Sequence, residues 1–197
     1  VMASMDTNIH MKTSMRGALL AGLKRKVLTG ESLFLNEFET EAGEGEVTFA
    51  PGTLGDIEHY YLEKGKTLYL QSSAYVASSG DIELNTSWQG FKGFFSGAGL
   101  FLIKVEGEGD VFFNGHGALM EIPVEEEFIV DTGCIAAFEE TLDYHVTTIG
   151  GLKTTIFGGE GLVCKFRGKG KLWVQSRSVP VFAGWLWPFR PTRKDNN

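Results

Sequence analysis

The sequence of 197 residues has little cysteine, only five prolines and no long hydrophobic run. Its two cysteines, Cys134 and Cys164, exclude a disulfide-rich secreted scaffold and a four-cysteine zinc site, and their apolar neighbours predict buried, reduced thiols. No apolar run reaches the ~20 residues of a membrane-spanning helix, so the sequence argues against an integral membrane protein.

Recognisable catalytic and metal-binding motifs are also missing. The four histidines show no pair at the short spacing of a metal site: His10, His59, His116 and His145. His116 lies between two glycines and is expected to be a solvated turn residue rather than a ligand. We therefore predict no metal, no cofactor and no catalytic residue, and a protein that is not an enzyme.

Glycine is the residue in excess, with 26 among 197 residues, against a usual share of about 7%. The glycines are spread along the chain, and they separate short segments in which apolar and polar residues alternate, such as 67–71, 81–85 and 171–175. Helical periodicity is nearly absent, and its best candidate is the short segment 18–28. The sequence predicts an all-β fold.

One block of sequence recurs three times. A glycine, an apolar residue and a lysine stand at 22–24, 90–92 and 151–153, and each copy leads into a strand and then a charged glycine turn at 44–46, 108–110 and 169–171. A fixed order of blocks at a near-constant spacing is the signature of an internal repeat.

The repeat predicts three similar β-sandwich-like modules in a closed pseudo-threefold arrangement, which leaves no exposed sheet edge. Two acidic modules are 27–89 and 90–150. A basic module is composed of 1–26 plus 151–178, so that the N-terminal strands complete the last unit, and 179–197 is an apolar and basic tail. Because the first unit lacks its opening strand, we expect further residues ahead of Val1 in the natural protein.

Three signatures carry a family resemblance: Thr29 to Asn36, Gly99 to Lys104 with Val130 to Gly133, and Glu160 to Val163 with Gly168 to Ser178. Together they resemble the altered-inheritance-of-mitochondria family, number twenty-four, over about residues 1–178. The resemblance implies an all-β fold with repeats similar to the tryptophan-sensing RNA-binding attenuation protein, which assembles into rings. It implies no catalytic residues, because the family has none established.

The net charge of −7 argues against nucleic acid as a partner. Residues 27–89 and 90–150 each hold 2 basic and 11 acidic side chains, whereas 1–26 and 151–197 together hold 14 basic and 3 acidic ones. The argument is therefore weaker for the basic module. We expect this module to contact an acidic surface, either on another protomer or on an external anion, unless the charges serve no contact.

The three loops that carry the lysines are candidate binding tips at one end of the body. They present Leu23, Lys24, Phe91, Lys92, Leu152 and Lys153. Apolar tips with cations suit an anionic membrane surface or a protein partner. The alternative is that the apolar side chains fill the core and the lysines are solvated.

The tail is strongly apolar and ends in basic residues. Its candidate contact residues are Trp185, Leu186, Trp187 and Phe189. We expect them to pack on their own chain or on a neighbouring protomer, and an interfacial membrane anchor is the alternative, because tryptophan favours the headgroup region.

The sequence thus predicts a cytoplasmic, soluble, non-enzymatic scaffold or binding protein that forms homo-oligomers. Two alternatives stay open. The protein associates peripherally with a membrane through its loop tips and tail, or it binds or converts a small ligand in a pocket that no motif reveals.

Overall fold

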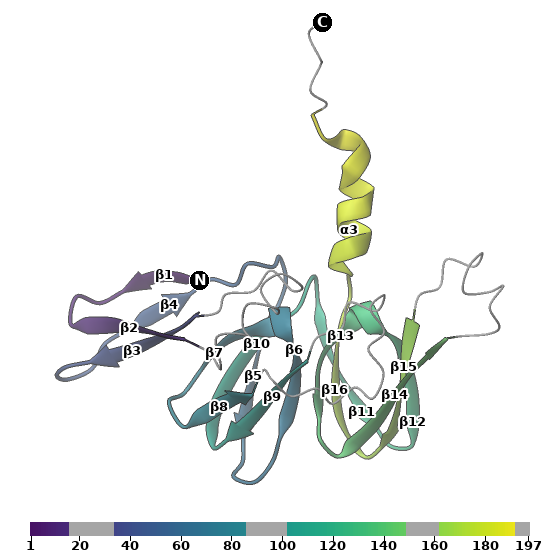
Figure 1. Ribbon diagram of the computed structural model, residues 1–197, viewed down its shortest axis with the longest axis horizontal. Helices are drawn as coiled ribbons and strands as arrows, with labels where there is room; N and C mark the ends of the chain where they lie inside the picture. Colours follow the sequence, from purple (N-terminus) through teal and green to yellow (C-terminus); the bar gives the residue numbers. More distant parts are fainter. Residues whose placement is uncertain (16–33, 86–101, 149–161, 192–197) are drawn as a thin grey trace, which may run out of the picture.

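The computed structural model describes residues 1–15, 34–85, 102–148 and 162–191. It consists mostly of antiparallel β-strands, with one short α-helix after the last strand (Figure 1). Alternation in the sequence becomes alternation in burial, as in the strand Leu68–Gln71, whose leucines are buried while its other two residues are half-buried. The predicted all-β fold is confirmed.

The strands fall into three groups, which we call units A, B and C. Unit A comprises β1 (Met2–Met5), β2 (Ile9–Met15), β3 (Phe34–Thr40) and β4 (Val47–Phe49). Unit B comprises β5 (Ile57–Leu62), β6 (Leu68–Gln71), β7 (Tyr75–Ser78), β8 (Ile82–Asn85), β9 (Leu102–Gly107) and β10 (Gly109–Asn114), with the 3-10 turn η1 (Ser72–Ala74) before β7. Unit C comprises β11 (Leu119–Val124), β12 (Glu127–Asp131), β13 (Ile135–Glu139), β14 (Leu142–Thr148), β15 (Leu162–Gly168) and β16 (Gly170–Gln175), with η2 (Thr132–Cys134) before β13.

Units B and C have the same strand pairing. The first strand of each pairs with the last, β5 with β10 and β11 with β16. The second pairs with the fifth, β6 with β9 and β12 with β15. Unit A has two of the ladders found in B and C: β2 pairs with β3 as β8 pairs with β9, and β1 pairs with β4 as β7 pairs with β10.

A β-bulge marks the ladder to the last strand of each unit. The register shifts between Met2 and Ser4 in unit A, between Phe112 and Phe113 in unit B, and between Ile135 and Ala137 in unit C. A bulge inserts one residue into one strand and increases the local twist. Its recurrence lets positions be matched between units, so that Val47, Val111 and Leu172 are equivalent.

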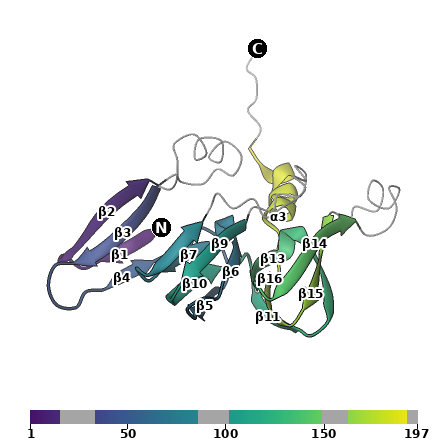
Figure 2. The same ribbon diagram turned by 60° about the horizontal axis from the view of Figure 1, so that its bottom comes forward.

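Units B and C share one sheet and two cores. Strand β13 pairs with β6, which joins them into a six-stranded sheet in the order β11-β16-β13-β6-β9-β8. One core gathers around Phe113 and Trp173, and the other around Phe138 and Phe166. Unit A stands apart from this body, as Figure 2 shows, and its two ladders pair with no strand of units B or C among the described residues.

The composite module that the sequence predicts, 1–26 plus 151–178, includes residues outside the described ranges and stays a prediction. Among the described residues, no ladder joins 1–15 to 162–175; β1 and β2 pair with β4 and β3, whereas β15 and β16 pair with strands of 119–148. Pairing within a unit closes a shorter loop than pairing between the chain ends, and a shorter loop costs less entropy.

Candidate functional site

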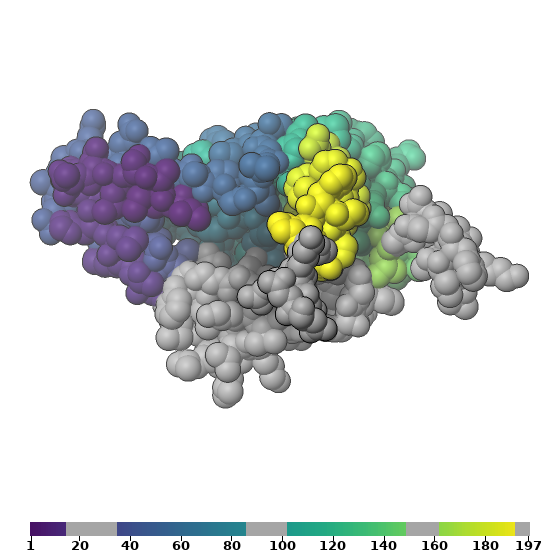
Figure 3. Space-filling view, turned by 90° about the horizontal axis from the view of Figure 1, so that it is seen from above, coloured from purple at the N-terminus to yellow at the C-terminus, as the bar shows by residue number. Residues whose placement is uncertain are grey.

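The apolar tail forms a helix that leaves the body. Helix α3 (Val179–Leu186) follows β16 after three residues, and the 3-10 turn η3 (Trp187–Phe189) continues it. Pro180 lies in the first turn, where its missing N–H removes no helical hydrogen bond. Seen from above, α3 stands over the boundary between units B and C (Figure 3).

The large apolar side chains of this helix are exposed. Trp185 is 62% exposed, Trp187 63% and Phe189 71%, and no residue of α3 or η3 is buried. Trp185 lies between Phe182 and Phe189, with ring centroids 6.0 and 5.6 Å away. The guanidinium of Arg190 lies 3.4 Å from the centre of the Trp187 ring, a cation–π contact. Solvent therefore faces a row of three rings, Phe182, Trp185 and Phe189, and a separate exposed ring, Trp187, that lies against Arg190.

The predicted tail residues lie near one another on this helical segment, but they do not pack on units B and C. Trp185, Leu186, Trp187 and Phe189 lie on one short helical segment with more than two fifths of each side chain exposed. Packing on the own chain, one of the two expected outcomes, is not observed for these residues. The surface is left available for a neighbouring protomer or for a membrane.

A small polar pocket lies at the base of the helix. Its volume is about 110 Å³, and it is lined by Thr53, Gln71, Ser73, Ala74, Asn114, Gly133, Gln175, Val179 and Pro180. The lining offers amides and hydroxyls but no carboxylate, imidazole or amine. Such a set can orient a small polar molecule, or about three waters, by hydrogen bonds.

Two amide side chains control the polarity of the pocket. The side-chain oxygen of Gln175 accepts a hydrogen bond from the backbone N–H of His116 at 2.9 Å, and its side-chain nitrogen donates one to the Gly133 carbonyl at 2.8 Å. Asn114 is only 3% exposed, and its Nδ2 donor has no partner among the described residues. An unpaired buried donor costs free energy, so the pocket favours an acceptor atom beside Asn114.

Sequence reasoning did not find this pocket. The one available signal is local: Asn114 and Gln175 are the last residues of their strands and are buried directly after another buried residue, Phe113 or Val174. A polar residue that interrupts strict alternation at an inward position is the kind of signal that marks a polar site. Three other lining residues, Thr53, Gln71 and Pro180, show no such interruption of the alternation.

His116 is not the solvated turn residue that the sequence predicts. It is 6% exposed, and its ring lies 5.4 Å from that of Phe182, at the start of α3. The helix covers the turn, which explains the burial. Neither ring nitrogen of His116 has a hydrogen-bond partner among the described residues.

The cysteines are unpaired thiols. Cys164 is fully buried in the core of unit C, and burial raises the pKa of its thiol to about 12. Cys134 is half-buried, and burial, together with the charge of Asp131, raises the pKa of its thiol as well. Raised values make both thiols poor nucleophiles.

The predicted loop tips lie outside the described residues: Leu23, Lys24, Phe91, Lys92, Leu152 and Lys153. Within the described ranges, no three His, Cys, Asp or Glu side chains are grouped so that they could hold a metal ion. Of the helices in the part of the chain that the structure describes, none has the length and hydropathy to span a bilayer.

The fold and the site define a class: an all-β protein of several antiparallel sheets, which carries an exposed aromatic helix and a small pocket of amides and hydroxyls. Comparison with known proteins identifies the family. The family model described as "Mitochondrial biogenesis AIM24" matches residues 1–177, so the chain belongs to this family, as the resemblance implied.

Two streptococcal proteins are similar to the chain. An uncharacterised protein of Streptococcus pyogenes serotype M6 is 31% identical over 193 residues, which cover 96% of this chain and 77% of that protein. A crystal structure of a Streptococcus pyogenes protein, 29% identical, matches with a TM-score of 0.76 and covers 96% of this chain and 86% of that one. Neither of these two proteins is described with an activity.

Proposed function

We propose that the protein is a non-enzymatic scaffold that self-associates through α3, with the helix of one copy packed on a second copy. The observation that carries the proposal is the exposed aromatic surface of Trp185, Trp187 and Phe189. Large apolar side chains that a soluble protein leaves exposed together on one short segment mark an interaction site. Each large apolar side chain that becomes buried contributes roughly 1.5–3 kcal/mol.

The charge distribution supports a second copy as the partner. The exposed C-terminal end of α3 carries Arg190, and the sequence adds Arg193 and Lys194 beyond the described residues. Units B and C present most of the acidic side chains, among them Glu125 and Glu126 in the turn between β11 and β12. A basic helix end and an acidic body complement each other between two copies.

A pseudo-threefold, ring-protein-like body is part of the proposal. Its support is the two ladders that all three units have and the bulge that recurs at matched positions. In such a body the units surround one axis, and the predicted loop tips share one end of it. The residues that line the pocket include no acid or base, which is compatible with a scaffold.

Peripheral membrane association is the second candidate, and the same helix favours it. Tryptophan and arginine side by side, as in Trp187 and Arg190, suit the headgroup region. The net charge of −7 opposes approach to an anionic surface. We therefore place the protein in the cytoplasm, with membrane contact as the alternative.

Small-ligand binding is the third candidate. The unpartnered Nδ2 of Asn114 favours a molecule with an acceptor atom, and the volume of about 110 Å³ limits it to a few heavy atoms. Ordered water satisfies the same requirement, which is why this candidate ranks below self-association.

The experiment is sedimentation velocity on the whole chain, on Trp185→Ser/Trp187→Ser and on a matched control, Tyr61→Ser. Tyr61 is an aromatic residue with 52% exposure on β5, away from α3. We expect the parent and Tyr61→Ser to self-associate, and the double variant to dissociate with Kd raised at least about 100-fold, equivalent to 2.7 kcal/mol.

Flotation with phosphatidylserine vesicles separates the candidates. A chain that stays monomeric at all concentrations but floats with the vesicles, and loses flotation in the double variant, contradicts the scaffold and supports the membrane role. Association that is unchanged in 1 M salt counts against the charge complementarity, because salt screens such contacts.

A further inference from the structure

The pocket at the base of α3 lies at a position where the equivalent units B and C differ. Asn114 ends β10 and Gln175 ends β16, so the two amides are equivalent. The longer side chain of Gln175 reaches the carbonyl of Gly133 in η2 at 2.8 Å. The equivalent of Gly133 in η1 is Ser73, which lines the pocket, but the Nδ2 group of Asn114 has no acceptor among the described residues. The pocket therefore lies where a shorter amide leaves a hydrogen bond unmade.

A second difference between the two units replaces a negative charge by a neutral amide. Asp131 is the N-cap of η2, and its carboxylate accepts a hydrogen bond from the backbone N–H of Gly133 at 2.7 Å. The equivalent N-cap of η1 is Gln71, whose side chain makes no capping hydrogen bond. Gln71 lines the pocket, whereas Asp131 does not. The lining therefore holds amide groups and no carboxylate that would repel an anion.

Helix α3 brings its N-terminal end to the same pocket. Val179 and Pro180, the first two residues of this eight-residue helix, line the pocket. The first N–H groups of a helix have no acceptor within it, and together they carry a partial positive charge. The side chain of Ser178 does not cap them, and the first turn holds no acidic residue. The helix end therefore favours an acceptor atom that carries negative charge.

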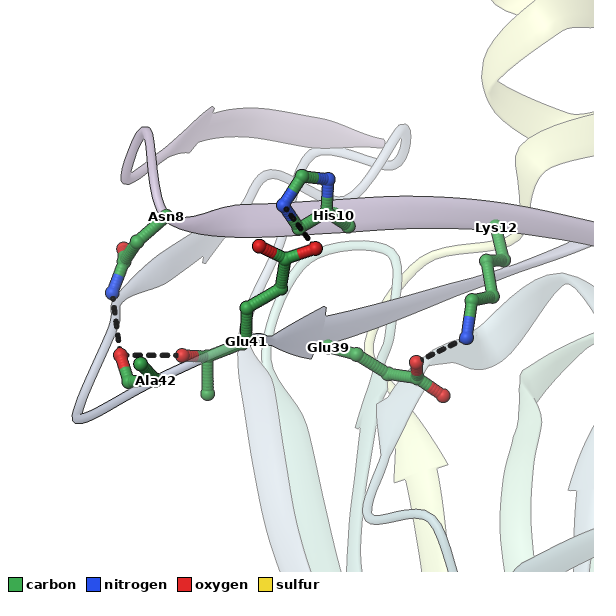
Figure 4. Close-up of polar contacts among 7 residues, drawn as sticks. Asn8, His10, Lys12, Glu39, Glu41 and Ala42 are labelled. Atoms are coloured by element: carbon green, nitrogen blue, oxygen red, sulfur yellow. Dashed lines mark hydrogen bonds and ion pairs between the residues drawn. The ribbon is translucent and has the colours of Figure 1, made fainter.

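Polar side chains of unit A show the contrast with Asn114. The Nδ2 group of Asn8 donates to the carbonyl of Ala42 at 3.3 Å, and Lys12 pairs with Glu39 (Figure 4). Both contacts lie at the surface, where water also serves these groups. Asn114 is only 3% exposed, so its donor depends on a partner inside the pocket, and a buried donor without one costs free energy.

We propose that this pocket binds a short monocarboxylate through the Nδ2 group of Asn114 and the N-terminal end of α3. The proposal deepens small-ligand binding, the third candidate function, and rests on it, whereas self-association through α3 is independent of it. The lining groups come from separate parts of the chain: Asn114 from β10, Val179 from α3, and Thr53 from the segment between units A and B. The Oγ1 hydroxyl of Thr53 also has no partner within the described part of the chain. A ligand held by these groups joins the base of the helix to the body.

Ionised carboxylates match these groups because they only accept hydrogen bonds, whereas an amide or an alcohol brings a donor of its own. No lysine, arginine or histidine is among the described residues that line the pocket. A phosphate group carries about −1.5 to −2 charges at neutral pH and would face no cation, so a single delocalised charge beside the helix end is favoured. The volume of about 110 Å³ admits only a short chain, such as that of acetate.

The test is two-dimensional ¹⁵N NMR on the whole chain with Trp185→Ser/Trp187→Ser, so that self-association through α3 does not interfere. The side-chain NH₂ signals of Asn114 are assigned by their disappearance in Asn114→Asp. Sodium acetate is titrated in exchange for sodium chloride at constant ionic strength, and acetamide, which has a similar shape but no charge, is the matched probe. We expect acetate to shift the Asn114 signals to saturation with a Kd at least about tenfold lower than that of acetamide.

Two variants of Asn114 locate the site, and the backbone amide signal of Val179 follows acetate binding in each of them. Asn114→Gln rebuilds in unit B the arrangement of unit C: the longer amide is expected to reach the Ser73 carbonyl and to fill the gap, so the acetate affinity falls at least about tenfold. Asn114→Asp keeps the size of the side chain but replaces the donor by an acceptor, and we expect the same loss. Asn36→Gln, the same change as the first at an exposed position of unit A, leaves the affinity unchanged.

Three results overturn the proposal. No saturable shift with either probe means that the pocket holds only water, and small-ligand binding fails with it. Acetamide that binds as tightly as acetate, or more tightly, leaves small-ligand binding in place and overturns the carboxylate class. Acetate binding that both Asn114 variants leave unchanged places the anion elsewhere on the chain. Self-association through α3 stands or falls by sedimentation alone, so its failure is distinguishable from each of these results.

Discussion

Units A and C have the same ladders and very different interiors. Ile9 and Leu142 are equivalent and both buried, yet the next inward positions diverge: Met11 is 48% exposed, whereas Tyr144 is half-buried against Phe138 and Phe166. The strands around these residues pair in the same register. Pairing alone therefore does not create a core.

The covering hairpin explains the difference. Burial of an apolar side chain on a sheet requires a second layer, and in unit C this layer comes from β11 and β12. The composition of unit A reflects its openness, since Asn36 and Thr48 stand where unit C has Cys164 and Trp173. The largest consequence is expected in stability.

Truncation of equivalent phenylalanines measures the difference directly. Phe166→Ala removes a completely buried ring that packs 5.0 Å from Phe138, and we expect a loss of about 3–5 kcal/mol in the free energy of unfolding. Phe38→Ala removes a half-buried ring, and we expect about 1 kcal/mol. Urea unfolding followed by circular dichroism provides both values.

Equal losses in the two variants would show that the interior of unit A is as closed as that of unit C, and would contradict the difference in packing between the two units. A separate, early transition that only Phe38→Ala shifts would show instead that unit A unfolds independently of the body.

The sequence predicted the class of fold and the family because both depend on local patterns. Alternation around Leu68 and Leu70 and the glycine turns around 109 and 170 suffice to predict strands and their ends. Which strands pair across the chain depends on loop closure and on a second layer. That residues 1–26 complete 151–178 depends on such long-range pairing and stays a prediction, since parts of both segments lie outside the described residues.

The helix and the pocket depend on tertiary contacts that the sequence does not display. Helix α3 has apolar residues all around, so it shows no amphipathic period, and only Pro180 in its first turn indicates a helix start. His116 is buried because Phe182, 66 positions later, covers it. Asn114 and Gln175 come together only through the packing of units B and C.

Thiol reactivity sharpens the comparison at one position. Cys164 is buried with a pKa raised to about 12, so at pH 8 almost none of it is thiolate, whereas the equivalent Asn36 is exposed. We expect Asn36→Cys to react with iodoacetamide at least about 100-fold faster than Cys164 in the folded chain. Mass spectrometry of the labelled peptides measures both rates in one sample.

The same raised pKa has a consequence for stability. Unfolding returns the pKa of the Cys164 thiol to its ordinary value of 9.0, so the unfolded state releases the thiol proton at a lower pH than the folded state does. Above pH 9 this release favours the unfolded state, and the free energy of unfolding falls. The stability of the parent is expected to fall between pH 9 and pH 11 more steeply than that of Cys164→Ala. Parallel curves would contradict the burial of the thiol.

The last comparison concerns the end of the strand before the charged turn, where the smallest effect is expected in unit A. Gly107 has a φ of +117°, and a Cβ there would overlap the Asp81 carbonyl oxygen, so Gly107→Ala should cost about 1–3 kcal/mol. Unit A has Thr40 at this position, with its hydroxyl hydrogen-bonded to the Ala42 carbonyl at 3.1 Å. Because Thr40 is exposed and adopts no left-handed backbone, Thr40→Ala should change stability by less than about 0.5 kcal/mol, as thermal unfolding can measure. A large cost at Thr40 would mean that the turn of unit A is as constrained as those of units B and C, although its backbone is not left-handed.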